Sequence, residues 1–322
     1  MRTRTLLTSL LAATAATGGM LLSAGPSAAA STIEVGTAAQ LKTALRGARP
    51  GDTIHLADGT YTGNFKATTP STATARITVT GSPKAVLTAS GGYGLHLNGA
   101  SYWTVSGLTV TGGQKGIMID AAQGVMVDGV AVHDVAMEGV HFRNSSSDDL
   151  IRKSKIYDTG NDGSGMGEGV YVGTANTLSD RSDRSDRIQI LHNTIGPGVG
   201  VENVDVKEGT TGPRTVGNTF DGSGLTGVNY DDSWVDVKGN DALVQDNTGT
   251  GTTNDGYQTH TQRSGWGCGT VFKGSKSTLT GAAGSTRLAI DATNYSASCR
   301  TTVCSSNTVT GGKGLTNITV TS

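Results

Sequence analysis

The segment Gly116-Ile117-Met118-Ile119-Asp120 is one copy of a motif that recurs along the chain and decides the fold. Its second and fourth residues are apolar, and its fifth is charged. Six further segments repeat this alternation, the last with Thr259 in the fourth position: Gly94-Leu95-His96-Leu97-Asn98, Gly139-Val140-His141-Phe142-Arg143, Gly169-Val170-Tyr171-Val172-Gly173, Asn203-Val204-Asp205-Val206-Lys207, Trp234-Val235-Asp236-Val237-Lys238 and Gly256-Tyr257-Gln258-Thr259-His260. Such alternation is typical of β-strands, whose successive side chains point to opposite faces.

The spacing of the seven segments indicates a solenoid. Their first residues are separated by 22, 23, 30, 34, 31 and 22 positions, and most segments are followed by a second short strand. A repeat of this length cannot bury its own apolar side, so successive repeats stack and share one core. The pattern predicts an all-β fold, a right-handed parallel β-helix of about ten coils, with the seven segments in one parallel sheet. Residues 39–46 read as a short amphipathic helix that caps the N-terminal end.

The N-terminal residues are typical of an export signal. Arg2 and Arg4 precede an apolar run, and Ala28-Ala29-Ala30 offers a small-residue cleavage site. We therefore expect residues 1–30 to be a secretory signal peptide and residues 31–322 to be a single β-helix domain of an extracellular protein. No later stretch is apolar enough to span a membrane.

Composition narrows the possible partners. Without Arg2 and Arg4 the chain has 23 basic and 26 acidic residues, a balance that argues against nucleic-acid binding, for which a basic surface is usual. We expect a monomer. Three cysteines are present, and export permits a disulfide. Cys299 with Cys304, or Cys268 with either of them, is possible.

The outward positions of the repeated strands carry the candidate site. The third and fifth residues of each strand should face solvent, stacked coil over coil at roughly 4.8 Å. Insertions in the middle coils would form walls, giving a groove. An ordinary solvated sheet face, with charges pairing across strands, is the alternative explanation. The mixture of acidic, basic and aromatic groups favours function. The candidates on this face are His141, Arg143, Tyr171, Asp205, Lys207, Asp236, Lys238 and His260, with Glu168 and Glu202 just before their strands.

A long groove on an exported protein suits a linear polysaccharide, and lysines among acids suit one built from uronates. A uronate chain is cleaved most easily by β-elimination, in which a base removes the C5 proton and the C4 oxygen leaves. The adjacent carboxylate must be neutralised, either by Ca²⁺ or by cationic side chains. A lysine can be the base if its pKa is lowered. Glu202, Asp205, Lys207, Asp236 and Lys238 supply these parts within two coils.

Two motifs resemble known families. Pro50-Gly51-Asp52 with Asp58-Gly59-Thr60-Tyr61 resembles the entry motif of the pectate-lyase-like superfamily, which implies the fold. The segment from Glu202 to Lys207, with Asp236 and Lys238 one coil later, resembles the alginate and chondroitin lyases of polysaccharide lyase family six. A weaker likeness, through Asn254-Asp255-Gly256-Tyr257, is to the family nine pectate lyases.

The family-six resemblance implies roles for individual residues. Glu202 would be a Ca²⁺ ligand, assisted by Glu168 or Asp205, and Lys207 would be the base. Lys238 stands where that family has an arginine. The resemblance says nothing of the other candidates: from their places on the outward face, His141, Arg143, Tyr171, Asp236 and His260 are expected to bind substrate, and Tyr171 could instead protonate the leaving oxygen.

The expected function is that of a secreted, Ca²⁺-assisted lyase. Its substrate would be an acidic polysaccharide, with a pectate-like chain preferred and alginate next. Two alternatives remain, a carbohydrate-binding β-helix without activity and a glycoside hydrolase, which needs two suitably spaced carboxyl groups.

Overall fold

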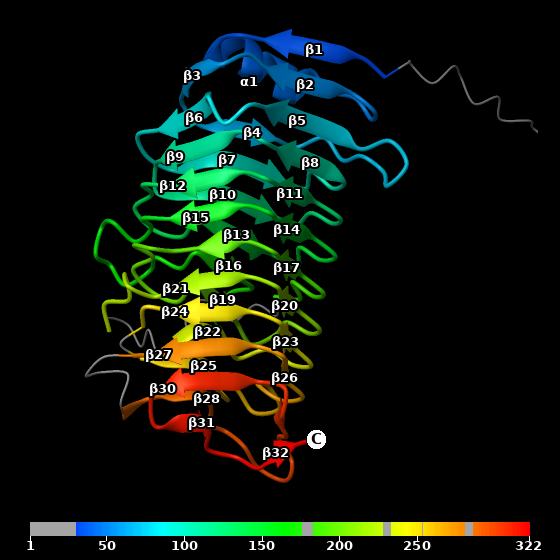
Figure 1. Ribbon diagram of the computed structural model, residues 1–322. Coiled ribbons are helices and arrows are strands. Elements are labelled where there is room, and N and C mark those ends of the chain that lie inside the picture. Colours follow the sequence, from blue (N-terminus) through cyan, green and yellow to red (C-terminus); the bar gives the residue numbers. More distant parts are fainter. Residues whose placement is uncertain (1–29, 176–182, 228–232, 253, 281–285) are drawn as a thin grey trace, which may run out of the picture.

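A computed structural model of the chain describes residues 30–175, 183–227, 233–252, 254–280 and 286–322. Nearly all of it is β-structure, coiled as a right-handed solenoid of about 9 turns (Figure 1). The predicted fold class is confirmed. Residues 1–29 of the predicted signal peptide lie outside the described residues. In the described part of the chain, no helix has the length and apolar character needed to cross a membrane.

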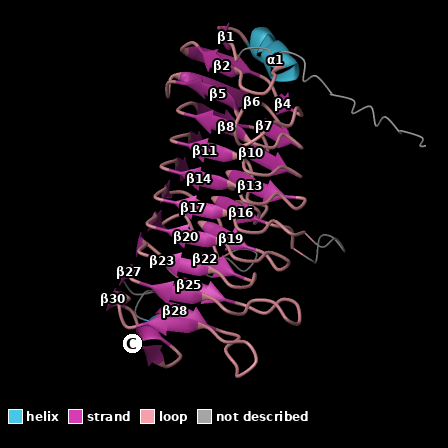
Figure 2. Cartoon of the chain, turned by 90° about the vertical axis from the view of Figure 1, so that its right-hand side faces the viewer, coloured by secondary structure: helices cyan, strands magenta, loops and turns pink. Residues whose placement is uncertain are grey.

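A complete coil contributes one strand to each of three parallel sheets, and β1 and β32 at the two ends add two more strands to the first sheet (Figures 1 and 2). Sheet 1 has twelve strands: β1 Thr32–Val35, β2 Thr53–Leu56, β5 Ile77–Gly81, β8 Trp103–Ser106, β11 Met126–Asp128, β14 Leu150–Arg152, β17 Gln189–Leu191, β20 Arg214–Val216, β23 Leu243–Gln245, β26 Val271–Lys273, β29 Thr302–Cys304 and β32 Val320–Thr321. Sheet 2 has ten: β3 Gly59–Thr62, β6 Ala85–Ala89, β9 Thr109–Gly112, β12 Ala131–His133, β15 Lys155–Tyr157, β18 Thr194–Ile195, β21 Thr219–Asp221, β24 Thr248–Thr250, β27 Lys276–Leu279 and β30 Thr308–Gly311.

Sheet 3 contains all seven of the repeated segments, as predicted. Its ten strands are β4 Phe65–Ala67, β7 Tyr93–Asn98, β10 Lys115–Asp120, β13 Val140–Arg143, β16 Val170–Val172, β19 Val204–Val206, β22 Ser233–Val237, β25 Asp255–Thr259, β28 Leu288–Ala292 and β31 Gly314–Thr316. Val170, Val204, Val235 and Tyr257 are paired in register on successive strands and are fully buried. The apolar second position of the repeat therefore forms a continuous column in the core.

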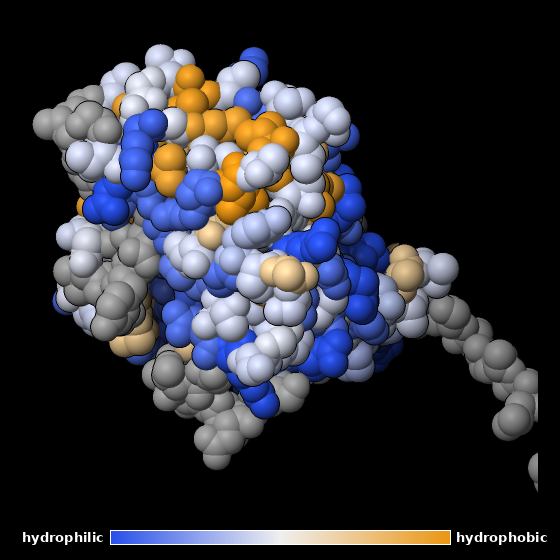
Figure 3. Space-filling view, turned by 90° about the horizontal axis from the view of Figure 1, so that it is seen from below, coloured by the Kyte–Doolittle hydropathy of each residue, from blue (hydrophilic) through white to orange (hydrophobic). Residues whose placement is uncertain are grey.

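The two ends of the solenoid differ. Helix α1, Ala38–Gly47, covers the N-terminal end and buries Leu41, Ala44 and Leu45 against the core; it confirms the predicted cap. At the other end, Figure 3 shows apolar surface on the C-terminal coil, where Val320 is 39% exposed and Leu315 and Ile318 are partly buried. Near that end Cys268 and Cys299 form a disulfide, one of the possible pairings. Cys304 is a free cysteine.

Candidate active site

The outward column of sheet 3 has the register that the sequence predicts. His141 pairs with Tyr171, Tyr171 with Asp205, and Asp205 with Asp236 on adjacent parallel strands. These four side chains therefore lie side by side, one per coil. Lys207 and Lys238 follow β19 and β22 at the next outward position, and His260 follows β25.

The expectation that these residues face open solvent is wrong. Asp205 and Asp236 are at most 1% exposed, and His141 and Tyr171 at most 5%. They point away from the core, and side chains of neighbouring coils pack against them. Just after β13, the Asp183 carboxylate accepts backbone N–H bonds from Asn144 at 2.9 Å and Ser145 at 2.8 Å, which fastens the segment before β17 to the end of that strand. Residues 176–182, which precede Asp183, lie outside the described residues.

Burying ionised carboxylates without oppositely charged partners would cost a large free energy. An ion-pair network supplies these partners. Lys238 Nζ lies 3.1 Å from Asp205 Oδ1 and also contacts the Asp236 carboxylate. Lys207 Nζ contacts Asp205 Oδ2. On the far side, His260 Nδ1 lies 2.9 Å from Asp236 Oδ1. The structure thus brings both predicted lysines to the same carboxylate.

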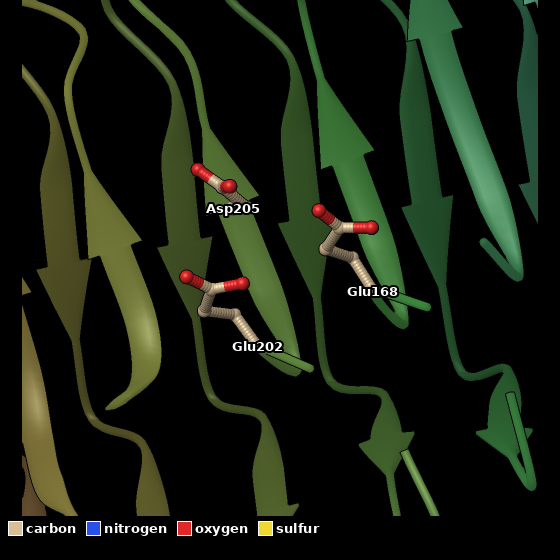
Figure 4. Close-up of side chains that lie close together, drawn as sticks. All are labelled: Glu168, Glu202 and Asp205. Atoms are coloured by element: carbon tan, nitrogen blue, oxygen red, sulfur yellow. The ribbon is translucent and has the colours of Figure 1, made fainter. Parts of the chain in front are cut away.

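The three predicted metal ligands form a compact acidic cluster. Each of Glu168, Glu202 and Asp205 offers a carboxylate oxygen, and these atoms all lie within 4.8 Å of one another. Glu202 and Asp205 come from one coil, three residues apart, and Glu168 comes from the coil before, with their carboxylates gathered on one side of the sheet (Figure 4). Burial raises the pKa of Glu168 to about 8, and the Glu138 and Asp205 carboxylates add to the effect. Burial and Asp205 also raise the pKa of Glu202 well above its usual value.

This cluster fits a hard divalent cation. Four buried carboxylates, those of Glu168, Glu202, Asp205 and Asp236, stand against the two ammonium groups of the lysines. Glu168 Oε2 is buried and has no hydrogen-bond partner. The excess negative charge can be balanced by a proton, as the raised pKa of Glu168 indicates, or by a bound cation. Carboxylate oxygens are the ligands that Ca²⁺ prefers.

Lys207 and Tyr171 form the part of the site best suited to proton transfer. The Lys207 Nζ atom lies 5.0 Å from the centroid of the Tyr171 ring. Burial raises the pKa of Tyr171 well above 10, with help from Asp205, so the phenol keeps its proton at neutral pH. Burial alone would lower the pKa of Lys207, but Asp205, Glu202 and Glu168 outweigh it and raise this pKa.

A buried polar contact supports Tyr171 from the preceding coils. Lys115 Nζ lies 2.7 Å from Glu138 Oε1 and 3.3 Å from His141 Nδ1. Because an ammonium group can only donate, His141 Nδ1 accepts, and its Nε2–H donates to the Gly173 carbonyl at 2.9 Å. Burial and Lys115 lower the pKa of His141 well below 6.5. This neutral ring packs edge-on against Tyr171, with centroids 4.4 Å apart, so His141 supports the site rather than ionising in it.

Arg143 stands apart from the acidic cluster. Its guanidinium pairs with Asp120 on the preceding coil, with Nε 2.8 Å from Oδ1 and Nη2 3.0 Å from Oδ2. The sequence places both residues in the outward column, so this pair could have been found as a cross-strand contact. It marks a second polar centre on the same face.

Comparison with known proteins identifies the class of enzyme. A search of curated proteins gave no match. The crystal structure of an alginate lyase from Paenibacillus sp. str. FPU-7 matches 91% of this chain and 99% of its own, with 40% sequence identity and a TM-score of 0.84. This protein is a polysaccharide lyase. It belongs to the same family as that enzyme, because the identity extends over nearly the whole of both chains.

Further comparisons concern the fold. A family model described as the right-handed β-helix region matches residues 84–242 of this polysaccharide lyase. The pectate lyase Pel9A matches 89% of the chain and 78% of its own, at 14% identity and a TM-score of 0.64. PfbA, a surface adhesin of Streptococcus pneumoniae, matches 87% of this chain and 73% of its own, at 12% identity and a TM-score of 0.59. Together they confirm the predicted pectate-lyase-like fold.

Proposed function

We propose that this enzyme cleaves alginate by β-elimination, with Lys207 as the base. The observation that carries the proposal is the position of Lys207 and Tyr171 beside each other, above a buried acidic cluster. The 40% identity to an alginate lyase favours alginate over the pectate-like chain that the sequence alone placed first.

The chemistry requires a base and a proton donor on one uronate. The neutral Lys207 amine takes the C5 proton, a C4–C5 double bond forms, and the C4–O bond to the neighbouring sugar breaks. The departing oxygen takes a proton from the Tyr171 hydroxyl, whose raised pKa keeps it protonated until that moment. Proton transfer from the Lys207 ammonium to the phenolate then restores both groups.

The carboxylates of Glu168, Glu202 and Asp205 would hold Ca²⁺. When bound, this ion would neutralise the substrate carboxylate and so make the C5 proton more acidic. The same three carboxylates are the groups that raise the pKa of Lys207. Ca²⁺ would balance the charge of these carboxylates, and burial would then lower the pKa of Lys207. A lower pKa gives Lys207 the neutral form that a base needs. Lys238, held by Asp205 and Asp236, would bind the substrate carboxylate.

The network disfavours a glycoside hydrolase. That reaction needs one carboxylic acid and one carboxylate at a set separation. Asp205 and Asp236 lie on adjacent strands and both contact the Lys238 ammonium. Burial opposes the charge on Asp236, but Lys238 and His260 outweigh it and hold its pKa below the usual value. Asp236 is therefore ionised and unable to act as the acid.

We also propose that the enzyme is exported. The signal-like residues 1–30 favour export, and the Cys268–Cys299 disulfide fits an oxidising compartment. An extracellular lyase would meet its polymer directly. N-terminal sequencing of the protein from culture supernatant would test this, with a start at Ser31 expected.

The decisive assay measures the ultraviolet absorbance of the unsaturated uronate product across alginate, pectate and a neutral polysaccharide, with and without chelator. We expect a signal with alginate that chelator abolishes and Ca²⁺ restores. Calorimetric titration of chelator-treated protein should show Ca²⁺ binding that Glu202→Gln weakens and Asp128→Asn, on the outer face of sheet 1, leaves unchanged. Reducing-end release without an unsaturated product would instead mean hydrolysis, and binding without any product would mean a carbohydrate-binding protein.

A further inference from the structure

The polar centre around Asp120 lies on the same outward face as the reaction centre but nearer the N-terminus. Asp120 accepts four hydrogen bonds: from His96 Nε2 at 2.9 Å, from Asn144 Nδ2 at 2.9 Å, and the two from Arg143. The side chain of Asp120 is 7% exposed, whereas that of Arg143 is 27% exposed. The carboxylate is thus the buried anchor, and the guanidinium is the group that reaches the surface.

The pairing leaves one edge of the guanidinium available. A guanidinium has five N–H donors in a planar fork. Asp120 occupies the Nε–Nη2 edge of Arg143. Tyr93, two coils toward the N-terminus, is a further side-chain hydrogen-bond partner of this guanidinium. The Nη1–Nη2 edge is the one at which a second carboxylate can bind in the bidentate geometry that arginine favours, with the Tyr93 hydroxyl beside it.

A glycine separates Arg143 from the base. Along the outward column, Gly173 follows Arg143 and Lys207 follows Gly173, one strand apart in each step. Gly173 has φ +88°, and a Cβ atom at this position would lie 2.8 Å from Thr210 Cγ2. Both facts require glycine. The outward position between Arg143 and Lys207 therefore carries no charged side chain, and Thr210 packs over it. The two cations lie two strand spacings apart, roughly 10 Å.

We propose that Arg143 binds the carboxylate of a uronate that neighbours the one deprotonated by Lys207, because the two cations lie two strand spacings apart on one face of sheet 3. The inference rests on the proposed function in taking the ligand to be a polyuronate. Asp120 holds the guanidinium side-on and so orients its other edge outward. Arg143 is then a substrate-binding residue that takes no part in the proton transfers.

Binding and turnover should separate in the variants. In the active enzyme, Arg143→Gln should raise KM for alginate about tenfold or more, because one charge-assisted bidentate contact is lost. Its kcat should change by less than about threefold, since the contact is the same in ground and transition states. Arg143→Lys should show an intermediate KM, since it keeps the charge and loses the fork. A matched control is Arg152→Gln, because Arg152 Nη2 also pairs with an aspartate of the preceding coil, Asp128, at 2.6 Å, but on sheet 1.

Titration of mannuronate oligosaccharides of increasing length into the Lys207→Ala variant, with and without Arg143→Gln, tests the subsite independently of catalysis. The affinity gained when the oligosaccharide becomes long enough to reach Arg143 should disappear in the double variant. Equal length dependence in both proteins, with normal circular dichroism, would overturn the subsite even if the enzyme is a lyase. If the unmutated protein has no lyase activity but Arg143→Gln still removes the gain in affinity with oligosaccharide length, the subsite is retained and the proposed reaction is rejected.

Discussion

Two stacks of buried polar side chains run along this solenoid, and they differ in whether their hydrogen-bond donors and acceptors have partners within the stack. One consists of Asn193, Asn218 and Asn247 at the bend between sheets 1 and 2. The other consists of the acids Glu138, Glu168 and Glu202, each just before a strand of sheet 3, with Asp205 and Asp236 beside them. Both repeat a polar residue on consecutive coils, and both exclude solvent.

The asparagine stack is self-sufficient. Asn218 Oδ1 accepts from the backbone N–H of Asn193 at 2.8 Å and from its Nδ2 at 3.0 Å. Asn218 in turn donates Nδ2 to Asn247 Oδ1 at 3.0 Å and to the Ile190 carbonyl at 2.8 Å. Because an amide carries both donor and acceptor, each asparagine satisfies the next. Such a stack stabilises the coil and needs no ligand.

The acidic stack lacks this balance. Ionised carboxylates only accept, and Oε2 of both Glu138 and Glu168 is buried without a partner. Lys115 neutralises Glu138, but the next coils hold more acids than bases. A buried polar repeat whose donors and acceptors match is structural, whereas one that remains unmatched indicates a binding or catalytic role.

The largest expected effect comes from removing the base. Lys207→Ala should lower the elimination rate by about 10²–10⁴-fold, the usual effect of losing a general base. Tyr171→Phe should also reduce kcat, since the ring and its packing remain while the proton donor is lost. Product absorbance with saturating alginate measures both. Unchanged turnover in Lys207→Ala would move the base to Lys238 or His260.

Breaking the asparagine stack should affect stability and spare catalysis. Asn218→Ala leaves the Asn193 backbone N–H and the Ile190 carbonyl without their partners inside the coil. Each such group costs about 1–3 kcal/mol, so we expect a fall in thermal midpoint of about 4 °C or more. Calorimetry and kcat at a temperature well below the midpoint measure the two properties. A stable but inactive Asn218→Ala would contradict the purely structural role of this stack.

Relieving the acidic stack should have the opposite effect on metal-free protein. The folded pKa of Glu168, about 8, lies above its unfolded value of roughly 4.3, so rising pH between these values destabilises the fold. Glu168→Gln removes this loss, and its thermal midpoint in chelator at neutral pH should exceed that of the parent by about 2 °C or more. Added Ca²⁺ should reverse the order. A lower thermal midpoint for Glu168→Gln in chelator would mean that groups of the protein already neutralise the negative charge of the acidic stack.

The smallest effect concerns Asp120, whose carboxylate accepts hydrogen bonds from His96, Arg143 and Asn144. Burial opposes its charge, but His96 and Arg143 outweigh burial and lower its pKa. A lowered folded pKa gives stability that is present above the unfolded value, roughly 3.9, and is lost as pH falls below it. Asp120→Asn should therefore lower the thermal midpoint at pH 6, and the difference should shrink below about pH 4. A constant difference across that range would show that the charge of Asp120 is not involved.

The core positions were predictable because a strand permits one alternation and the apolar residues fix it. Val204 and Val206 must face inward, so Asp205 must face outward beside Asp236, as found. The burial of that outward face could not be predicted, since it depends on how long side chains from several coils pack and pair over one another. The protonation of Lys207 also depends on carboxylates of two coils at once, which no single segment reveals.

The solenoid also separates distance along the chain from distance along the axis. Arg143 and Lys207 are two strands apart on sheet 3, although an insertion-containing coil of 34 residues lies between Gly169 and Asn203. Insertions enlarge the loops and leave the rise per coil unchanged. The distance between two residues along the sheet is therefore set by the number of strands between them. Loops around the site can therefore be lengthened, shortened or exchanged in design while the base and the arginine keep their separation.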